Sequence, residues 1–208
     1  MGPFAPLTAQ VRRQSLDAIL ARGEDEIRVF VYGSLMWDAA YRNFDRSNAL
    51  LPGYRRSFCV WTAHARGTPE LPGLGLGLRR DAGARCGGVL IRLSAVAHRE
   101  ILEALWEREM WTGVYDPERV AIITDDGPAT ALAFIVNRRH PQFAGDLAPA
   151  EAARHIALAE GVFGTCREYF YATERALRDI PGTTKEFALL GRLVRREAAR
   201  AAGDAPSG

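Results

Sequence analysis

The stretch Val29-Phe30-Val31-Tyr32-Gly33-Ser34-Leu35-Met36-Trp37 joins an apolar run to an abrupt turn signal. The largely apolar segment from Ile27 to Tyr32 predicts a buried strand. We expect this strand to end at Gly33-Ser34, where a residue without a Cβ lets backbone N–H groups turn toward a bound anion. Gly-Ser after a strand is also common in plain turns. The stretch therefore predicts a strand whose turn is either an anion site or a simple reversal.

Residues 95–110 predict a helix, with Ser94 as its N-cap and Gly113 placed to end it. At 100° per residue, one face of this helix is apolar and contains Ile101, Leu102, Leu105, Trp106 and Met110. Glu109 falls near the centre of that face. The other charged residues fall on the flanks or the far side, where we expect them to be solvated: Arg99, Glu100, Glu103, Glu107 and Arg108.

An inward-facing carboxylate such as Glu109 needs compensation, because burying an unpaired charge costs several kcal/mol. One interpretation is a structural salt bridge with one of the many arginines of the chain. The other is a functional group, because desolvation raises the pKa of a carboxyl toward values useful for proton transfer. The helix pattern alone leaves both interpretations open.

Composition indicates an ordinary globular protein, since 48% of the 208 residues are hydrophobic and 25% are charged. The net charge is only +2, and Lys185 is the sole lysine among 27 basic residues. The arginines are scattered among acids, which favours a compositional bias over a nucleic-acid surface. We therefore expect no nucleic-acid partner.

Cysteine and histidine usage gives no sign of a disulfide framework or a metal site. Cys59, Cys86 and Cys166 are odd in number and widely separated, which fits a reducing compartment. The histidines show no metal-ligand spacing: His64, His98, His140 and His155. There is no signal-peptide pattern and no run of eighteen apolar residues. We expect a cytoplasmic protein without a metal and without a membrane segment.

The order of predicted elements indicates an α+β fold built around a small barrel. Strands are predicted at 27–32, 54–63, 74–78, 85–93, 120–125 and 130–137, and helices at 8–22, 95–110, 149–160, 166–180 and 185–202. Thr165 and Thr183 are suited to cap the last two helices, the second through a capping box with Glu186. We expect an N-terminal arm and helix at 1–26, one domain at 27–197, and a tail at 198–208 that frays.

Five motifs, in this order along residues 27–190, make the sequence similar to the ChaC family of γ-glutamylcyclotransferases, which act on glutathione. The first is Val-Phe-x-Tyr-Gly-Ser-Leu-Met-Trp at 29–37, followed by Arg-Gly-Thr-Pro-Glu-x-Pro-Gly at 66–73. Trp-x-Arg-Glu-Met-x-Thr-Gly at 106–113 comes next, then Arg-His-Pro at 139–141 and Gly-Thr-x-x-x-Tyr at 164–169. Many family members have Gly where this chain has Val31.

The resemblance implies a γ-glutamylcyclotransferase-like fold, a small mixed β-barrel flanked by helices, and no cofactor. It assigns the catalytic carboxylate to Glu109. It also implies that the α-carboxylate end of the substrate is held by the backbone of the residues Val31, Tyr32, Gly33, Ser34 and Leu35, with Tyr169 lining the same pocket.

The implied reaction cleaves glutathione to 5-oxoproline and Cys-Gly, with the α-amine of the substrate as nucleophile and Glu109 as general acid and base. Arg66 is a candidate partner for the terminal carboxylate of Cys-Gly, although most arginines are simply surface residues. Two alternatives stay open: a cyclotransferase for other γ-glutamyl amides or amino acids, and a binding module that senses a small acidic metabolite without chemistry. The sequence leaves the oligomeric state open.

Overall fold

The computed structural model describes residues 3–180 and 185–203. These residues form a closed barrel in which the strands are neighbours in the order β1-β3-β2-β4-β5. Its strands are β1 (Glu26–Val31), β2 (Arg46–Thr62), β3 (Gly73–Ser94), β4 (Tyr115–Thr124) and β5 (Gly127–Val136). Strands that are adjacent in this order pair antiparallel. The barrel is closed by a parallel pairing of β1 with β5, in which Val29 lies opposite Leu132. The barrel is therefore mixed, as predicted.

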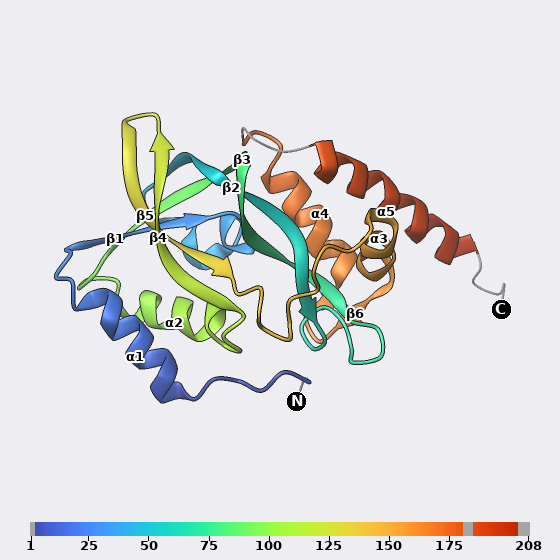
Figure 1. Ribbon diagram of the computed structural model, residues 1–208, viewed down its shortest axis with the longest axis horizontal. Coiled ribbons are helices and arrows are strands. Elements are labelled where there is room, and N and C mark those ends of the chain that lie inside the picture. Colours follow the sequence, from blue (N-terminus) through green and yellow to red (C-terminus); the bar gives the residue numbers. More distant parts are fainter. Residues whose placement is uncertain (1–2, 181–184, 204–208) are drawn as a thin grey trace.

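Helices lie in two groups on different sides of the barrel (Figure 1). The first group pairs α1 (Ala9–Leu20) with α2 (Arg99–Glu109), which carries Glu109 at its end. The second group contains α3 (Pro149–Leu158), α4 (Cys166–Ala176) and α5 (Lys185–Gly203). A short hairpin of β6 (Glu160–Gly161) and β7 (Gly164–Thr165) joins α3 to α4 and was not predicted.

The pairing of β2 with β3 differs from the prediction because β3 continues through an irregularity instead of ending there. The segments 74–78 and 85–93, predicted as two strands, are both parts of β3, and β2 begins at Arg46 rather than Tyr54. The register shifts where Pro52 faces Arg85 and Tyr54 faces Arg80. This irregularity interrupts the alternation of apolar residues, but the pairing resumes on both sides of it. Sequence alternation alone therefore divided one strand in two.

Capping interactions adjust the predicted helix ends. Helix α2 begins at Arg99 rather than Ala95, because Ser94 Oγ accepts the N–H of Ala97 at 3.1 Å and caps a preceding turn instead. The predicted cap Thr165 is confirmed, as part of a capping box with Glu168 at the start of α4. Thr183 lies outside the described residues, as do residues 204–208 of the tail. Residues 198–203, which we expected to fray, are the last turns of α5.

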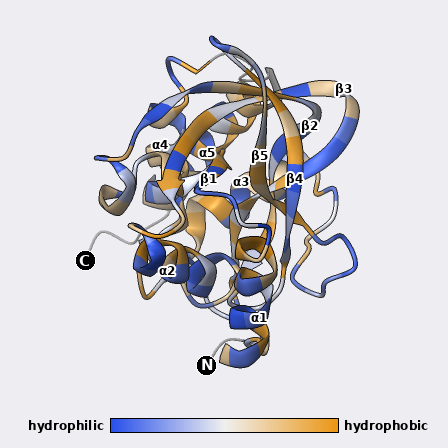
Figure 2. Ribbon diagram, turned by 90° about the vertical axis from the view of Figure 1, so that its left-hand side faces the viewer, coloured by the Kyte–Doolittle hydropathy of each residue, from blue (hydrophilic) through white to orange (hydrophobic). Residues whose placement is uncertain are grey.

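One apolar cluster fills the barrel and continues under the helices. Its largest fully buried side chains include Trp106 of α2 and Phe30 of β1. The ring of Trp106 packs edge-on against Phe134 of β5, with ring centroids 5.3 Å apart. Figure 2 shows hydrophobic colour on the strands at the centre of the molecule and hydrophilic colour at the outer bend of β3. Trp106 thus anchors α2 against the barrel three residues before Glu109.

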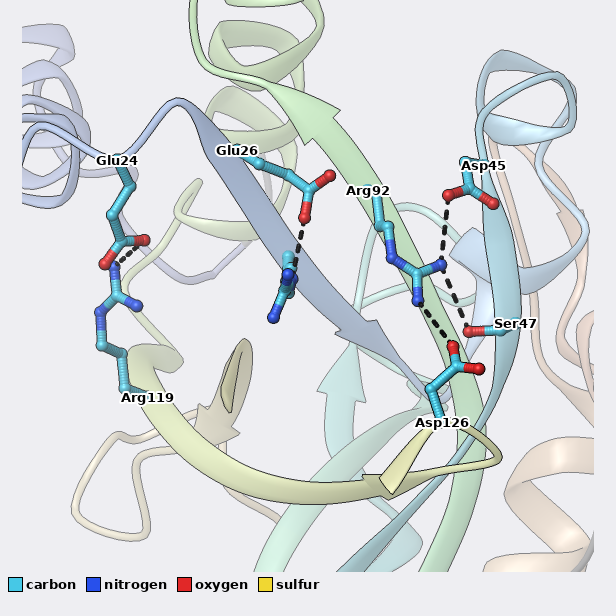
Figure 3. A network of polar contacts seen from close by, with 8 residues as sticks. Glu24, Glu26, Asp45, Ser47, Arg92, Arg119 and Asp126 are labelled. Carbon is cyan, nitrogen blue, oxygen red and sulfur yellow. Dashed lines mark hydrogen bonds and ion pairs between the residues drawn. The ribbon is translucent and has the colours of Figure 1, made fainter. Parts of the chain in front are cut away.

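Ion pairs on the outer face connect strands that are distant in sequence (Figure 3). Arg92 of β3 lies 3.3 Å from Asp45, which precedes β2, and 4.0 Å from Asp126 in the β4–β5 turn. Arg119 of β4 lies 2.6 Å from Glu24, just before β1. Exposed pairs of this kind contribute about 0–1 kcal/mol each. The buried apolar cluster therefore holds the barrel together, and these pairs support its register.

Candidate active site

A small cavity of about 40 Å³ opens where the end of β1 meets α2 and α4. Its lining comes from six separate segments: Phe30, Val31, Tyr32, Gly33, Ser34, Leu35, Leu76, Glu109, Tyr115, Phe134 and Tyr169. The structure thus brings Glu109, Tyr169 and the predicted loop residues 31–35 to one cavity, whereas Arg66 lies outside it. Phe30, Leu76, Tyr115 and Phe134 also line it, and none of them was predicted as a site residue, because isolated apolar or aromatic residues on separate strands carry no spacing signal.

The loop after β1 turns sharply at this cavity. A one-turn 3₁₀-helix, η1 (Ser34–Met36), begins directly after Gly33, and the N–H of Met36 donates to the carbonyl of Gly33 at 2.9 Å. The first N–H groups of a helix have no acceptor within it. The amides of Ser34 and Leu35 are in that position and border the cavity.

Gly33 leaves room in the cavity rather than relieving a left-handed backbone, because its φ is −136°. A Cβ at this position would lie 3.6 Å from Leu76 Cδ1 and 3.8 Å from the Tyr169 hydroxyl. Both of those residues belong to the cavity lining. Val31 is 2% exposed and also lies at the wall.

Glu109 is the last residue of α2, and its side chain is 15% exposed. Burial raises the pKa of this carboxyl above its ordinary value, the positive charge of Arg108 lowers it, and the negative charge of Asp38 raises it again. The net direction is upward. A carboxyl that is largely buried, borders a cavity and has a raised pKa is suited to take up and return a proton.

Arg108 connects Glu109 to the loop after β1, although the helical pattern had assigned it to a solvated flank. Its Nε lies 3.3 Å from Glu109 Oε1, one terminal nitrogen lies 2.5 Å from Asp38 Oδ2, and the other donates to Ser34 Oγ at 2.7 Å. The side chain is 39% exposed, so the predicted solvated flank position is confirmed, but the prediction did not include its contacts with Glu109, Asp38 and Ser34. A long arginine on a flank can reach back over an apolar face, and helical projection does not show this.

The structure has features of both interpretations of Glu109, the salt bridge and the functional group. The carboxylate has an arginine neighbour, as expected for a salt bridge. Arg108 also binds Asp38 and Ser34, and Glu109 still borders the cavity. The ion pair therefore does not remove Glu109 from the site.

Three tyrosines, Tyr32, Tyr115 and Tyr169, contribute to the wall beside Glu109 and Ser34. Tyr32 donates to the carbonyl of Phe134 and Tyr115 donates to the carbonyl of Leu76, each at 2.7 Å. The hydroxyl of Tyr169 accepts the N–H of Leu76 at 3.4 Å, so its own proton can be donated to another group. Burial raises the pKa of Tyr169 to about 12 and those of Tyr32 and Tyr115 well above their ordinary value. All three are therefore neutral phenols at physiological pH.

Arg66 is not among the residues that line this cavity. It donates to the carbonyl of Thr165 at 3.4 Å and lies 4.0 Å from Glu168 Oε2. These contacts tie the 66–73 loop to the start of α4. The structure thus gives Arg66 a structural connection and does not bring it to the other predicted site residues.

Residues 3–180 and 185–203 include no cluster of metal ligands and no membrane-spanning helix. No group of three or more His, Cys, Asp or Glu side chains in these ranges is arranged to hold a metal ion. Cys59, Cys86 and Cys166 are buried and unpaired with one another. No helix in the same ranges combines the length and apolar character needed to span a membrane.

Known proteins resemble this chain over most of its length. The family described as ChaC-like protein matches residues 27–196. The glutathione-specific gamma-glutamylcyclotransferase of Escherichia coli (strain K12) is 38% identical over 82% of this chain and 74% of its own length. Gamma-glutamylcyclotransferase 2-1 of Arabidopsis thaliana is 31% identical over 81% of this chain and 82% of its own. The crystal structure of a glutathione-specific gamma-glutamyl cyclotransferase from yeast has a TM-score of 0.73 at 19% identity, and the match covers 85% of this chain and 99% of that one.

The likeness to the yeast structure confirms the predicted γ-glutamylcyclotransferase-like fold. The family match begins at the start of β1 and extends into α5, so it includes the barrel and the whole cavity lining. Helix α1 lies outside it. This chain belongs to the ChaC-like family.

Proposed function

We propose that this protein is a γ-glutamylcyclotransferase that converts glutathione to 5-oxoproline and Cys-Gly. The observation that carries the proposal is the position of Glu109, a largely buried carboxyl with a raised pKa in a cavity bordered by the loop after β1. The similarity to the glutathione-specific enzyme of Escherichia coli supports the choice of substrate.

The proposed reaction needs one acid–base group because the nucleophile belongs to the substrate. The α-amine nitrogen of the γ-glutamyl group attacks its own γ-carbonyl carbon, and the new C–N bond closes a five-membered lactam. The bond from that carbon to the cysteine nitrogen then breaks. Glu109 takes the proton released by the attacking amine and gives it to the departing nitrogen, so no water, metal or redox cofactor enters the balance.

The cavity supplies orientation for this step. We propose that the γ-glutamyl end of the substrate enters the cavity and that Cys-Gly lies toward the rim. The amides of Ser34 and Leu35 would hold the α-carboxylate and steady the oxyanion, together with the backbone of Val31, Tyr32 and Gly33. Well-oriented intramolecular reactions gain about 7–11 kcal/mol from proximity.

Tyr169 would act as a hydrogen-bond donor to the substrate. Its hydroxyl is held at the wall by Leu76 and its ring packs against Trp37, with centroids 5.8 Å apart. Because the phenol is neutral, it adds a donor without adding negative charge beside Glu109. We place the enzyme in the cytoplasm, where glutathione is abundant and the three unpaired, buried cysteines would stay reduced.

The proposal is tested by measuring 5-oxoproline released from reduced glutathione by the purified protein, with Glu109→Gln alongside. Release by the wild type alone supports both the reaction and the base. If neither protein releases 5-oxoproline from glutathione or from γ-glutamyl dipeptides, the enzymatic proposal is wrong.

A second candidate is a cyclotransferase for other γ-glutamyl amides or amino acids. This candidate is favoured if only the γ-glutamyl end enters the cavity, because all such substrates share that end. Comparison of kcat/KM for glutathione and for γ-glutamyl dipeptides separates the two candidates. A purely anion-sensing module is disfavoured, because Glu109 would repel a bound anion.

A further inference from the structure

We propose that Arg12 is a positioning residue for Glu109, an inference that rests on the proposed function. Arg12 lies in the N-terminal arm, residues 3–20, which is outside the region matched by the family. The arm contacts α2 along its length and the chain just after it. Arg12 is the residue of the arm that contacts both sides of the turn that carries Glu109.

The guanidinium of Arg12 contacts three residues, Leu7, Glu107 and Trp111. Its side chain is 8% exposed, and one terminal nitrogen lies 2.7 Å from Glu107 Oε2. The other donates to the carbonyl of Leu7, and the whole group lies over the ring of Trp111, 4.9 Å from its centroid. Glu107 and Trp111 stand two residues before and two residues after Glu109. Arg12 therefore holds the chain on both sides of the proposed base.

Other contacts of the arm surround the same turn. The N–H of Leu7 donates to the carbonyl of Trp111 at 2.8 Å. Leu7 also packs against Gly113, where an added Cβ would lie 3.1 Å from its Cδ1. Ser15 Oγ accepts the indole N–H of Trp106 at 3.2 Å. The turn from residue 106 to 113 is thus bound to the arm at several points.

External restraint matters at this position because Glu109 ends the helix. The last turn of a helix is held by fewer backbone hydrogen bonds than its interior and frays readily. The N–H of Met110 donates to the carbonyl of Trp106, and the chain then reverses at Gly113, which has φ +77°. Glu107 is half exposed, as the helical pattern predicts, yet it pairs with an arginine that is almost fully buried. Loss of Arg12 would free the turn and let the Glu109 carboxylate move relative to the loop after β1.

The test compares kcat and KM for glutathione in Arg12→Gln, Arg12→Lys and the control Arg13→Gln. Arg13 is the exposed neighbour on the same helix, and it makes no ion pair within residues 3–180 and 185–203. We expect kcat of Arg12→Gln to fall roughly tenfold, since a displacement of about 1 Å can cost up to 10²-fold. KM should change less than twofold, and Arg13→Gln should match the wild type. Arg12→Lys, which keeps the charge opposite Glu107, should recover part of kcat.

A purely structural role gives a different result. In that case Arg12→Gln lowers the melting temperature, while kcat per folded molecule and its pH dependence stay at wild-type values, and the proposal is overturned. Glu107→Gln breaks the same pair from its exposed side and repeats the test if Arg12→Gln does not fold.

A readout without turnover separates this proposal from the proposed function. The pKa of Glu109 can be followed by ¹³C NMR of labelled glutamate, with Glu109→Gln identifying its signal. We expect Arg12→Gln to lower this pKa toward the ordinary value, because a displaced carboxyl becomes hydrated. If the wild type is inactive, the proposed function fails, and an unchanged Glu109 titration in Arg12→Gln then overturns the positioning role as well.

Discussion

Arg108 Nε lies 3.3 Å from Glu109 Oε1, while the same guanidinium binds Asp38 and Ser34. The proposed base is therefore coupled to the loop after β1 through its neighbour in sequence. The two charges next to Glu109 act on its pKa in opposite directions, since Arg108 lowers it and Asp38 raises it. This arrangement makes the pH dependence of turnover a direct test of the site.

Asp38→Asn and Arg108→Gln should shift the pH profile of kcat in opposite directions. Turnover requires ionised Glu109, so activity is lost as the pH falls through the pKa of this group. Removing Asp38 lowers that pKa and moves the acid limb to lower pH, whereas removing Arg108 raises it and moves the limb to higher pH. Steady-state rates across pH 4–9 measure both shifts. If the acid limbs of the two variants moved in the same direction, Glu109 would not be the titrating base.

Glu109→Gln should abolish turnover and leave the fold intact. Acid–base groups contribute about 10²–10⁴ in rate, so kcat should fall by at least two orders of magnitude. Substrate binding should survive, because the amides of Ser34 and Leu35 are unchanged. Calorimetric titration with glutathione checks binding, and Glu100→Gln, an exposed substitution on the same helix, is the control. Near-wild-type turnover in Glu109→Gln would reassign the base.

The same substitution should stabilise the protein at alkaline pH. The folded state raises the pKa of Glu109, so it favours the protonated form. Ionisation of this carboxyl therefore opposes folding increasingly as the pH rises from the ordinary pKa of a glutamate to the raised pKa, and fully above it. Gln cannot ionise and avoids that cost. The melting temperature of Glu109→Gln should exceed that of the wild type at pH 8, and the difference should shrink as the pH falls through the raised pKa and vanish below the ordinary pKa of a glutamate. A difference that stays constant with pH would contradict a raised pKa.

Local periodicity and turn chemistry could predict the inward position of Glu109 and the turn after β1, whereas the roles proposed for them came from the resemblance to the ChaC family. A helical projection placed Glu109 inward, and a strand followed by Gly33-Ser34 marked the turn. The sequence could not predict Tyr115 or Leu76, because the closed barrel brings distant strands together and no short-range pattern records this. Arg108 was missed for another reason: its Cα lies on the flank, and only its long side chain reaches the site.

Tyr115→Phe should weaken the fold more than it weakens substrate binding. Tyr115 donates to the carbonyl of Leu76, and the deletion of its hydroxyl leaves that carbonyl without this partner. An unsatisfied buried acceptor costs about 1–3 kcal/mol. Urea unfolding should show a loss of that size, with KM for glutathione changed less than twofold. A large rise in KM at unchanged stability would instead mean that Tyr115 contacts the substrate directly.

Gly33→Ala should close part of the cavity. The added Cβ would make ordinary van der Waals contact with Leu76 and Tyr169. The methyl group would occupy space between two walls of the site, so KM for glutathione should rise by about tenfold, equivalent to about 1.4 kcal/mol. Gly75→Ala is the matched control, because its Cβ would meet Val60 at ordinary contact distance and Gly75 is not part of the lining. If both variants bind glutathione like the wild type, the substrate does not enter between Leu76 and Tyr169, and the γ-glutamyl end must be held elsewhere.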